Sequence, residues 1–333
     1  MQAVYGDGSG FILLILTFNF FTLIMPLPKG KAGGYLALCT TSIVWGTTWV
    51  ASKVGVQEMP ALQMASIRQF FGGTIFVLFF MLYKKMALPT WREFGWLLMM
   101  GILMFVMANG LSTWSLNYIP TGLSALIGAL YPLCVVIIER VFYKSRNMTW
   151  LTLLGLLLGV TGIGIVFYEN AFHDQPEGFV LGVVLFVMAM LAWSVGTIFV
   201  ARNKMNMNPY YATGWQMLVG AALLFVAALC TKPLVPLTEI PVKIWLAIAY
   251  LVLLGSILSF VAFIYSIKKL PAAISSLYAY INPLIAMVTA AIVVDEKLTI
   301  NILWGAVVTL AGVFLVNYSI KKTKEKIIAE PEQ

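Results

Sequence analysis

Residues 119–133 read IPTGLSALIGALYPL, and the chain repeats this pattern at residues 270–284 as LPAAISSLYAYINPL. An offset of 151 residues aligns the leading proline, the serine four residues after it and the second proline twelve residues after it. Further downstream an offset of 150 residues aligns two glycines and a tyrosine, namely Gly155, Gly162 and Tyr168 with Gly305, Gly312 and Tyr318. This self-similarity predicts one structural unit that is used twice.

The composition is that of a membrane protein. Hydrophobic residues make up 61% of the 333 residues and charged residues only 10%, far from the values of soluble domains. The net charge of +8 does not gather on a basic helix face with interleaved aromatic residues, so nucleic-acid binding is not expected. The three cysteines lie in apolar runs and His173 lies in a polar connection, so we expect no disulfide framework, metal or other cofactor.

Ten apolar segments are each long enough to cross a bilayer. The connections between them are short, which predicts that consecutive segments are antiparallel neighbours. The expected spans are 35–55, 61–83, 94–116, 121–141, 150–168, 178–200, 209–229, 243–267, 271–293 and 300–319.

Residues 1–32 fit this pattern least. Their apolar run at 11–25 is short for a span, and neither a basic residue before it nor a small-residue cleavage site marks a signal peptide. Met25 is followed by PLPKGK, an ordinary basic start for a membrane protein. We therefore expect residues 1–24 to be an upstream extension, with Met25 as the alternative start; an eleventh segment is the other interpretation.

The distribution of charge orients the spans. With the N-terminus inside, the cytoplasmic connections and tails hold 16 of the 21 basic residues, and the outer connections hold only Lys53, Lys232, Lys243 and Lys297. Membrane proteins keep Lys and Arg on the cytoplasmic side. Both termini are therefore predicted to be cytoplasmic.

Five spans in each unit is an odd number. The second unit, residues 178–319, must then enter the membrane from the side opposite to the first unit, residues 33–168, and a basic tail at 320–333 remains cytoplasmic. Inverted repeats are typical of secondary transporters, whose solute site lies near the midplane between the halves. The predicted fold class is all-α integral membrane, with ten transmembrane helices as two inverted five-helix repeats and transport by alternating access.

The order of motifs also resembles a known family. The first span carries WGTTWVASK at residues 45–53, the second carries Arg68, and each proline-bounded hairpin leads into a last span with glycines. Across residues 35–319 this arrangement is similar to the EamA-like family of the drug/metabolite transporter superfamily. The resemblance implies a carrier of the bacterial inner membrane, usually an exporter of amino acids or related small metabolites, with a central cavity between its halves.

The second unit departs from the first at two points. Trp193 matches Trp45, but the basic residue after it, Arg202, follows nine residues on rather than eight. The acidic pair that ends the ninth span aligns with an uncharged and a basic residue of the first unit, that is, Asp295 and Glu296 with Ser145 and Arg146. We therefore do not expect equivalent gates at the two ends of the protein.

Arg68 is the only basic residue in the interior of a predicted span, since the others within the span bounds lie at the span ends. A guanidinium in the membrane needs a solvated cavity or a partner, because its desolvation is costly. Two interpretations remain open. Arg68 binds a carboxylate of the solute through its bidentate fork, or it reaches outward to Glu58 or to carbonyl groups at a helix end.

Glu139 is the only acidic residue inside a predicted span, seven residues after Pro132. A desolvated carboxylate there could carry a coupled proton. The alternative is a surface pair with Arg140, Lys144 or Arg146. The sequence leaves both roles open.

Polar and aromatic side chains recur on one face of several spans. Such faces line a solvated cavity or pack helices together through hydroxyl groups. A lining of this kind suits a zwitterionic or amphipathic small-molecule solute that could carry a carboxylate. The expected lining residues are Thr41, Trp45, Thr48, Trp49, Arg68, Asn109, Ser112, Ser124, Tyr131, Trp193, Ser259, Ser275, Tyr278 and Asn282.

Prolines and glycines predict where the spans bend and pack. Pro132 and Pro283 lie inside the fourth and ninth spans, where a proline frees a carbonyl group and bends the helix, so we expect hinges there. Gly155 and Gly159 form a Gly-x-x-x-Gly pattern on the fifth span. This pattern predicts packing inside the chain or, alternatively, a homodimer contact.

Two other classes of protein were weighed against a transporter. A membrane enzyme needs converging acids, a histidine or a metal within its spans, and these spans hold one glutamate, a single arginine away from the span ends and no histidine. An enzyme is therefore not expected. A non-transporting receptor or assembly subunit with the same fold is the alternative function, although the chain has no soluble sensing domain and no charged pore ring.

Overall fold

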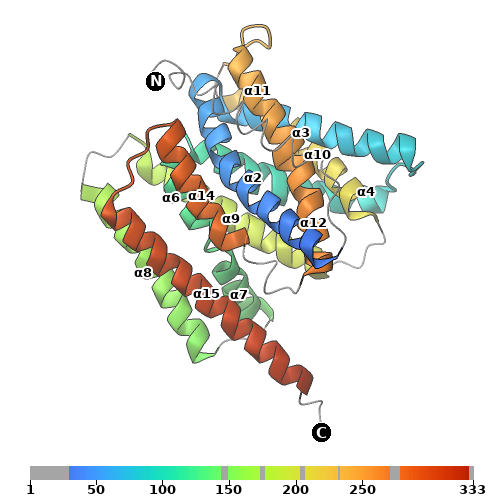
Figure 1. The fold of residues 1–333 in the computed structure, drawn as a ribbon. Coiled ribbons are helices and arrows are strands. Elements are labelled where there is room, and N and C mark those ends of the chain that lie inside the picture. The colour runs from blue at the N-terminus through green and yellow to red at the C-terminus, as the bar shows by residue number, and fades with distance from the viewer. Residues whose placement is uncertain are drawn as a thin grey trace.

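The computed structural model describes residues 30–143, 149–172, 177–202, 207–231, 233–270 and 278–329, so most of the expected extension 1–32, and Ser275, lie outside the described residues. All regular elements described are helical (Figure 1), which confirms the all-α prediction for this part of the chain. They are α2 (Lys31–Glu58), α3 (Ala61–Leu78), η1 (Phe79–Tyr83), α4 (Trp91–Gly101), η2 (Ile102–Gly110), α5 (Leu111–Ser115), α6 (Thr121–Gly128), α7 (Tyr131–Tyr143), α8 (Trp150–Phe172), α9 (Phe179–Arg202), α10 (Pro209–Thr231), α11 (Val242–Tyr250), η3 (Leu251–Leu258), α12 (Ser259–Lys269), α14 (Tyr278–Val293) and α15 (Ile300–Ala329).

Seven helical segments of the described residues are long and apolar enough to cross a membrane. They coincide with the second, third, fourth, sixth, seventh, eighth and tenth predicted spans. Shorter apolar helices, Trp150–Val166 and Tyr280–Val293, lie in the fifth and ninth spans. The 28 residues of α2 cover the first span, but their threonines, serines and glycines make that helix less apolar than the others.

Helix α2 is embedded among elements from the C-terminal half of the chain. It packs along α12 and α14 and also contacts α11 and η3 (Figure 1). A Cβ atom added at Gly46 would lie 2.6 Å from the side chain of Ile285 on α14, and the Thr47 hydroxyl is hydrogen-bonded to the Tyr250 hydroxyl on α11. These contacts carry the polar face of α2 into the middle of the protein.

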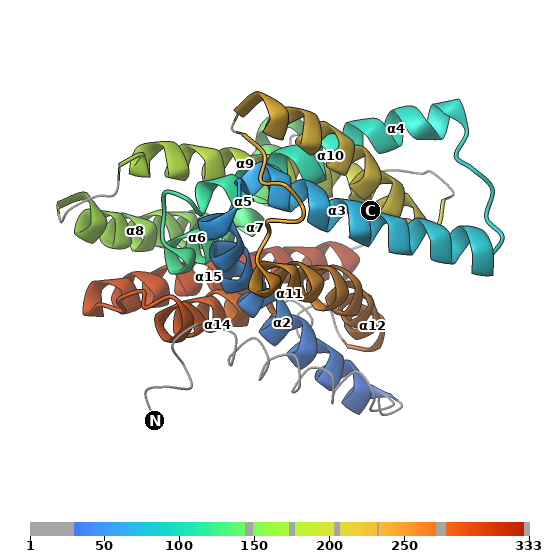
Figure 2. The same cartoon turned by 90° about the horizontal axis from the view of Figure 1, so that it is seen from above.

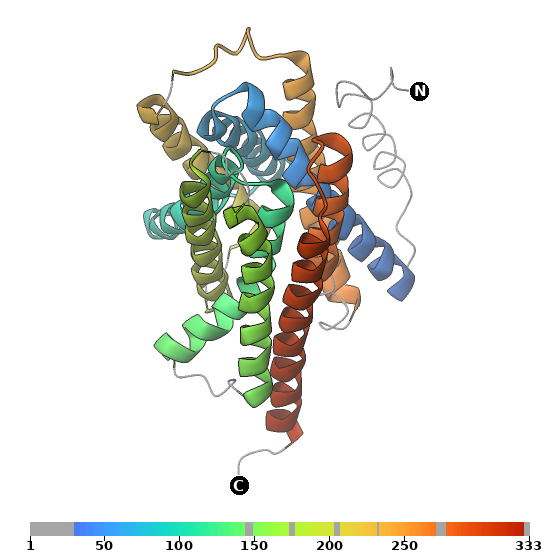
Figure 3. The same cartoon turned by 90° about the vertical axis from the view of Figure 1, so that its left-hand side faces the viewer.

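Helices α8 and α15 lie side by side along their length (Figures 1 and 3). A Cβ atom added at Gly155 would lie 2.7 Å from the carbonyl oxygen of Gly312, and one added at Gly162 would lie 2.6 Å from that of Gly305. The order of these contacts makes the two helices antiparallel. Gly155 and the buried Gly159 are therefore covered by helices of the same chain, and their face offers no free surface to a second copy.

Helices α3 and α10 form a second antiparallel pair (Figure 2). The Ser66 hydroxyl donates to the carbonyl oxygen of Ala221 at 2.8 Å, and a Cβ atom added at Gly73 would lie 2.8 Å from the carbonyl oxygen of Gly214. In sequence order α3 and α10 are the second and seventh predicted spans, and α8 and α15 are the fifth and tenth. Both close pairs thus join spans that occupy the same place in the two sequence repeats.

In the described part of the chain, four predicted spans are not continuous α-helices. The second, the third and the eighth each contain a π-helical stretch, η1, η2 and η3. The fourth breaks at Ala129 and Leu130, between α6 and α7. Pro132 accounts for this break, because it has no N–H to donate and its ring would clash with the carbonyl group four residues earlier, at Gly128. Pro283, by contrast, lies inside α14.

Candidate functional site

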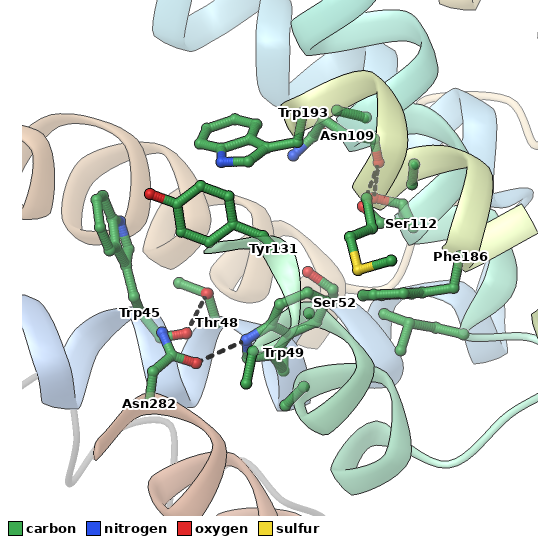
Figure 4. A pocket seen from close by; sticks show the side chains of 18 of the residues that line it. Trp45, Thr48, Trp49, Ser52, Asn109, Ser112, Tyr131, Phe186, Trp193 and Asn282 are labelled. Atoms are coloured by element: carbon green, nitrogen blue, oxygen red, sulfur yellow. Dashed lines mark hydrogen bonds between the residues drawn. The ribbon is translucent and has the colours of Figure 1, made fainter. Parts of the chain in front are cut away.

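A cavity of about 280 Å³ lies where these helices meet (Figure 4). Both sequence repeats contribute to it, through α2, α3, η2, α5, α6 and α7 from the first and through α9 and α14 from the second. The lining residues are Trp45, Thr48, Trp49, Ser52, Arg68, Ala108, Asn109, Ser112, Thr113, Leu116, Ala125, Gly128, Ala129, Tyr131, Phe186, Ala189, Met190, Trp193, Tyr278, Asn282 and Pro283. Arg68 is the only one of them with a formal charge.

Helix α2 presents two tryptophans to the cavity, and each donates a hydrogen bond across to the second unit. Trp45 Nε1 donates to the carbonyl oxygen of Gly255 in η3 at 3.0 Å, and Trp49 Nε1 donates to Asn282 Oδ1 at 3.0 Å (Figure 4). Because an indole nitrogen only donates, the oxygen of the Asn282 amide must face Trp49. The NH₂ group of Asn282 is then the part that remains to donate to a solute.

Arg68 reaches the cavity from α3. Its Nε donates to Ser256 Oγ at 3.3 Å, and its guanidinium lies beside Gly255, with Nη2 at van der Waals distance from the position of an added Cβ atom, 3.5 Å. Among the described residues no acidic side chain pairs with Arg68. Glu58, its possible partner by sequence, pairs with Lys243 at 2.5 Å instead. The guanidinium charge is thus not neutralised within the described part of the chain.

The π-helical stretch η2 places Asn109 on the cavity wall. Such a stretch does not satisfy its carbonyl groups in the α-helical way, and the hydroxyls of Ser112 and Thr113 donate to the Asn109 carbonyl oxygen at 2.9 and 2.8 Å (Figure 4). Buried Gln69 bonds the Asn109 side chain, with 2.7 Å between Nε2 and Oδ1. The backbone irregularity and these side chains together hold a polar wall beside Arg68.

Six aromatic side chains also line the cavity. The ring of Trp45 lies 5.4 Å from that of Tyr278, and the ring of Trp49 lies 5.6 Å from that of Phe186, measured between centroids. The side chains of Tyr131 and Tyr278 both line the cavity and lie close to each other. The site therefore combines one cationic group with flat apolar faces, which suits a solute that has an anionic or strongly accepting end and an apolar body.

The structure brings most of the predicted lining residues together but leaves three away from the cavity. Thr41, Ser124 and Ser259 are fully buried, at 0% exposure. Each hydroxyl donates to a backbone carbonyl of its own helix turn, at 2.9, 3.0 and 2.8 Å. A hydroxyl on a membrane helix satisfies itself in this way, so sharing a face with lining residues does not place it on the cavity wall.

The cavity wall also includes residues that a search for polar side chains missed. Phe186, Ala189 and Met190 line it from α9. They precede Trp193 at helical spacing and share its face. Helical periodicity counted back from Trp193 would have found them.

Glu139 and Pro132 do not line the cavity. The Glu139 carboxylate lies 3.7 Å from the Arg202 guanidinium of α9, and both side chains are partly exposed. Arg202 also lies over the ring of Tyr143, 3.7 Å from its centroid. Glu139 therefore has a basic partner, as one sequence interpretation required, but that partner comes from the other unit.

The fold and the site together define an all-helical protein of membrane-spanning character with a central cavity lined by aromatic side chains, and its relatives place it among the membrane transporters. The chain belongs to the EamA-like transporter family, whose sequence model matches it twice, at residues 32–168 and 180–318. The two matches coincide with the two sequence repeats. The family resemblance read from the motifs is thus confirmed, and a small-molecule solute and the lipid bilayer are the partners that this family implies.

Similar proteins from several organisms are also named as transporters. The chain is 29% identical over 254 residues to the "Uncharacterized inner membrane transporter YedA" of Escherichia coli (strain K12), covering 75% of this chain and 79% of that protein. It is 24% identical over 291 residues to the "Uncharacterized transporter YoaV" of Bacillus subtilis (strain 168), covering 87% and 98%. A crystal structure superposes with a TM-score of 0.62 at 16% identity, covering 88% of this chain and 99% of that one, which supports the fold alone.

Proposed function

We propose that the protein is a secondary transporter that exports amino acids or related small metabolites across the bacterial inner membrane by alternating access. The cavity of Figure 4 is its solute site. The observation that carries this proposal is a single guanidinium, Arg68, in an otherwise neutral and largely aromatic cavity between the two units. Membership of a transporter family makes a moving solute the reason for such a cavity.

The proposal includes the ten-span architecture with two inverted units, residues 33–168 and 178–319. Its support is the pairing of equivalent spans, α3 with α10 and α8 with α15, in opposite directions. Two copies inserted the same way up would hold equivalent helices parallel. The cytoplasmic placement of both termini rests on the distribution of Lys and Arg.

A carboxylate on the solute follows from the charge of the cavity. Arg68 has no acidic partner among the described residues, and its planar fork matches a carboxylate with two parallel hydrogen bonds. Indole and amide N–H groups add donors rather than negative charge. A solute that brings its own negative charge stabilises this arrangement, whereas a cationic solute would be repelled.

The break between α6 and α7 and the proline in α14 are the proposed hinges. Gly128 and Ala129 at the break, and Pro283 in α14, all line the cavity. A change of backbone angle at these points would reshape the site directly. Glu139 is not part of this proposal as a proton carrier, because its exposed pair with Arg202 fits a contact near the membrane surface.

Counterflow in proteoliposomes tests the transport function. Vesicles loaded with one unlabelled metabolite at a time, from a panel of amino acids, other carboxylic acids, nucleosides and polyamines, should accumulate the labelled form of a carried solute. Protein-free vesicles are the control. If no solute moved and none raised the thermal stability of the purified protein, the transporter proposal would fail and a receptor or assembly role would replace it.

A further inference from the structure

Near the C-terminus of α2, a set of contacts beside the cavity joins this helix to the chain between α5 and α6. Leu116 lines the cavity, and its carbonyl oxygen accepts a hydrogen bond from Lys53 Nζ at 2.5 Å. The carbonyl oxygen of Ile119 accepts a second one at 3.3 Å. Lys53 thus fixes the chain between α5 and α6 against α2, directly beside the solute site.

The same chain segment is held from the other side by Glu296, in the connection between α14 and α15. Its Oε1 accepts from the backbone N–H of Thr121 at 2.6 Å, and its Oε2 accepts from that of Gly122 at 3.1 Å. These N–H groups begin α6, whose N-cap residue, Pro120, supplies no side-chain cap. A carboxylate at this position satisfies the free donors and the positive end of the helix dipole.

The connection that carries Glu296 is built to turn sharply. Asp295 adopts a left-handed backbone conformation, with φ of 54°, and the Glu296 N–H returns to the carbonyl oxygen of Ala290 on α14 at 3.3 Å. Glu296 also interacts electrostatically with Lys53. Cation, carboxylate and helix start therefore form one cluster that joins the two units.

We propose that Lys53, Glu296 and the segment 116–122 form a latch that closes the cavity at the C-terminal end of α2 and must open for solute to pass. The distribution of charge predicts this end to be the outer one. The inference rests on the proposed alternating access and names the contact that separates the closed from the open state. Since α6 is separated from α7 at Ala129 and Leu130, α6 can move away from Glu296 while α7 stays packed.

The opposite end of the protein cannot use the same latch. In the aligned sequence repeat, Ser145 and Arg146 stand where the second unit has Asp295 and Glu296. The residue that aligns with Glu296 is a cation, Arg146, and a cation does not satisfy the N–H groups and the positive dipole end of a helix start as a carboxylate does. The two ends therefore open with different free energies, and the latch biases the protein toward the state that is closed at this end.

The test measures access to the cavity rather than transport. In a variant that lacks the three native cysteines, Ser112→Cys places one thiol on the cavity wall. A membrane-impermeant maleimide is applied to spheroplasts and, separately, to inverted membrane vesicles. Removing the carboxylate with Glu296→Gln should raise the reaction rate from the outer side about tenfold, and Lys53→Gln should raise it in the same direction.

Asp295→Asn is the matched control, since it removes the same charge one residue away, tolerates the left-handed backbone and leaves the Glu296 contacts in place. Its rate should stay within about twofold of the parent. If the thiol reacted from the cytoplasmic side, and neither Glu296→Gln nor Lys53→Gln changed its reaction rate, the latch would be overturned while the transporter proposal would stand. Reaction from neither side in any variant would overturn both.

Discussion

Replacing Arg68 by lysine separates a solute-binding role from a structural one. The positive charge remains, but the two parallel hydrogen bonds of the guanidinium fork become one contact from a point charge. Loss of one charge-assisted hydrogen bond costs about 1.5–3 kcal/mol, so a carboxylate solute should bind about 10- to 150-fold more weakly. The bond from the charged Arg68 Nε to Ser256 Oγ, at 3.3 Å, is also lost, at about 1.5–3 kcal/mol of stability.

The assay compares each carboxylate solute with its neutral amide in counterflow and in binding to the purified protein. Arg68→Lys should weaken binding of the carboxylate and leave that of the amide nearly unchanged. Arg92→Lys makes the same chemical change at an exposed position outside the cavity and should affect neither. Equal weakening of both solutes by Arg68→Lys would refute carboxylate binding and assign Arg68 a structural role.

Two further predictions concern packing and the orientation of the site. Gly155→Val should lower the free energy of unfolding by about 1–3 kcal/mol, because the new side chain would press on the backbone of α15. Gly164→Val is the control and should not lower it, because the space around its Cβ position is open. Thermal denaturation in detergent distinguishes the two variants. Trp49→Phe removes the donor to Asn282 and should weaken solute binding about twofold to tenfold, whereas Trp215→Phe removes an indole N–H that has no partner among the described residues and should not weaken it.

The helical elements were predictable because apolar length is a strong signal. A helix that crosses a bilayer needs about 20 apolar residues, and few other features of a sequence produce such runs. The face of α2 was predictable for the same kind of reason, since Trp45, Thr48 and Ser52 recur at helical spacing and all line the cavity. Thr41 follows the same spacing but lies one turn beyond the cavity, which periodicity alone does not reveal.

The irregular backbone was only partly predictable. Pro132 predicts a bend, and the helix ends at Gly128, as expected from the carbonyl group that the proline ring displaces. The π-helical stretches η2 and η3 contain no proline from which they could be predicted. Their positions follow from tertiary contacts, such as the bond from Trp45 to the Gly255 carbonyl oxygen, which no local pattern encodes.

These irregular stretches explain why the cavity is where it is. Inside a bilayer a backbone group that leaves the α-helical pattern needs another partner, and lipid supplies none. In this protein three of the non-α-helical stretches reach the cavity: Asn109 in η2 and Ala129 at the α6–α7 break line it, and the Gly255 carbonyl oxygen in η3 is bonded by the lining residue Trp45. The π-helical stretch η1 does not line it. Such stretches persist because side chains or a bound solute supply hydrogen-bond partners for their backbone groups. They are also where the backbone can change conformation at low cost. The same stretches of backbone therefore carry the groups that would recognise the solute and the points at which the helices could move. Solute binding and opening of the cavity should then be coupled.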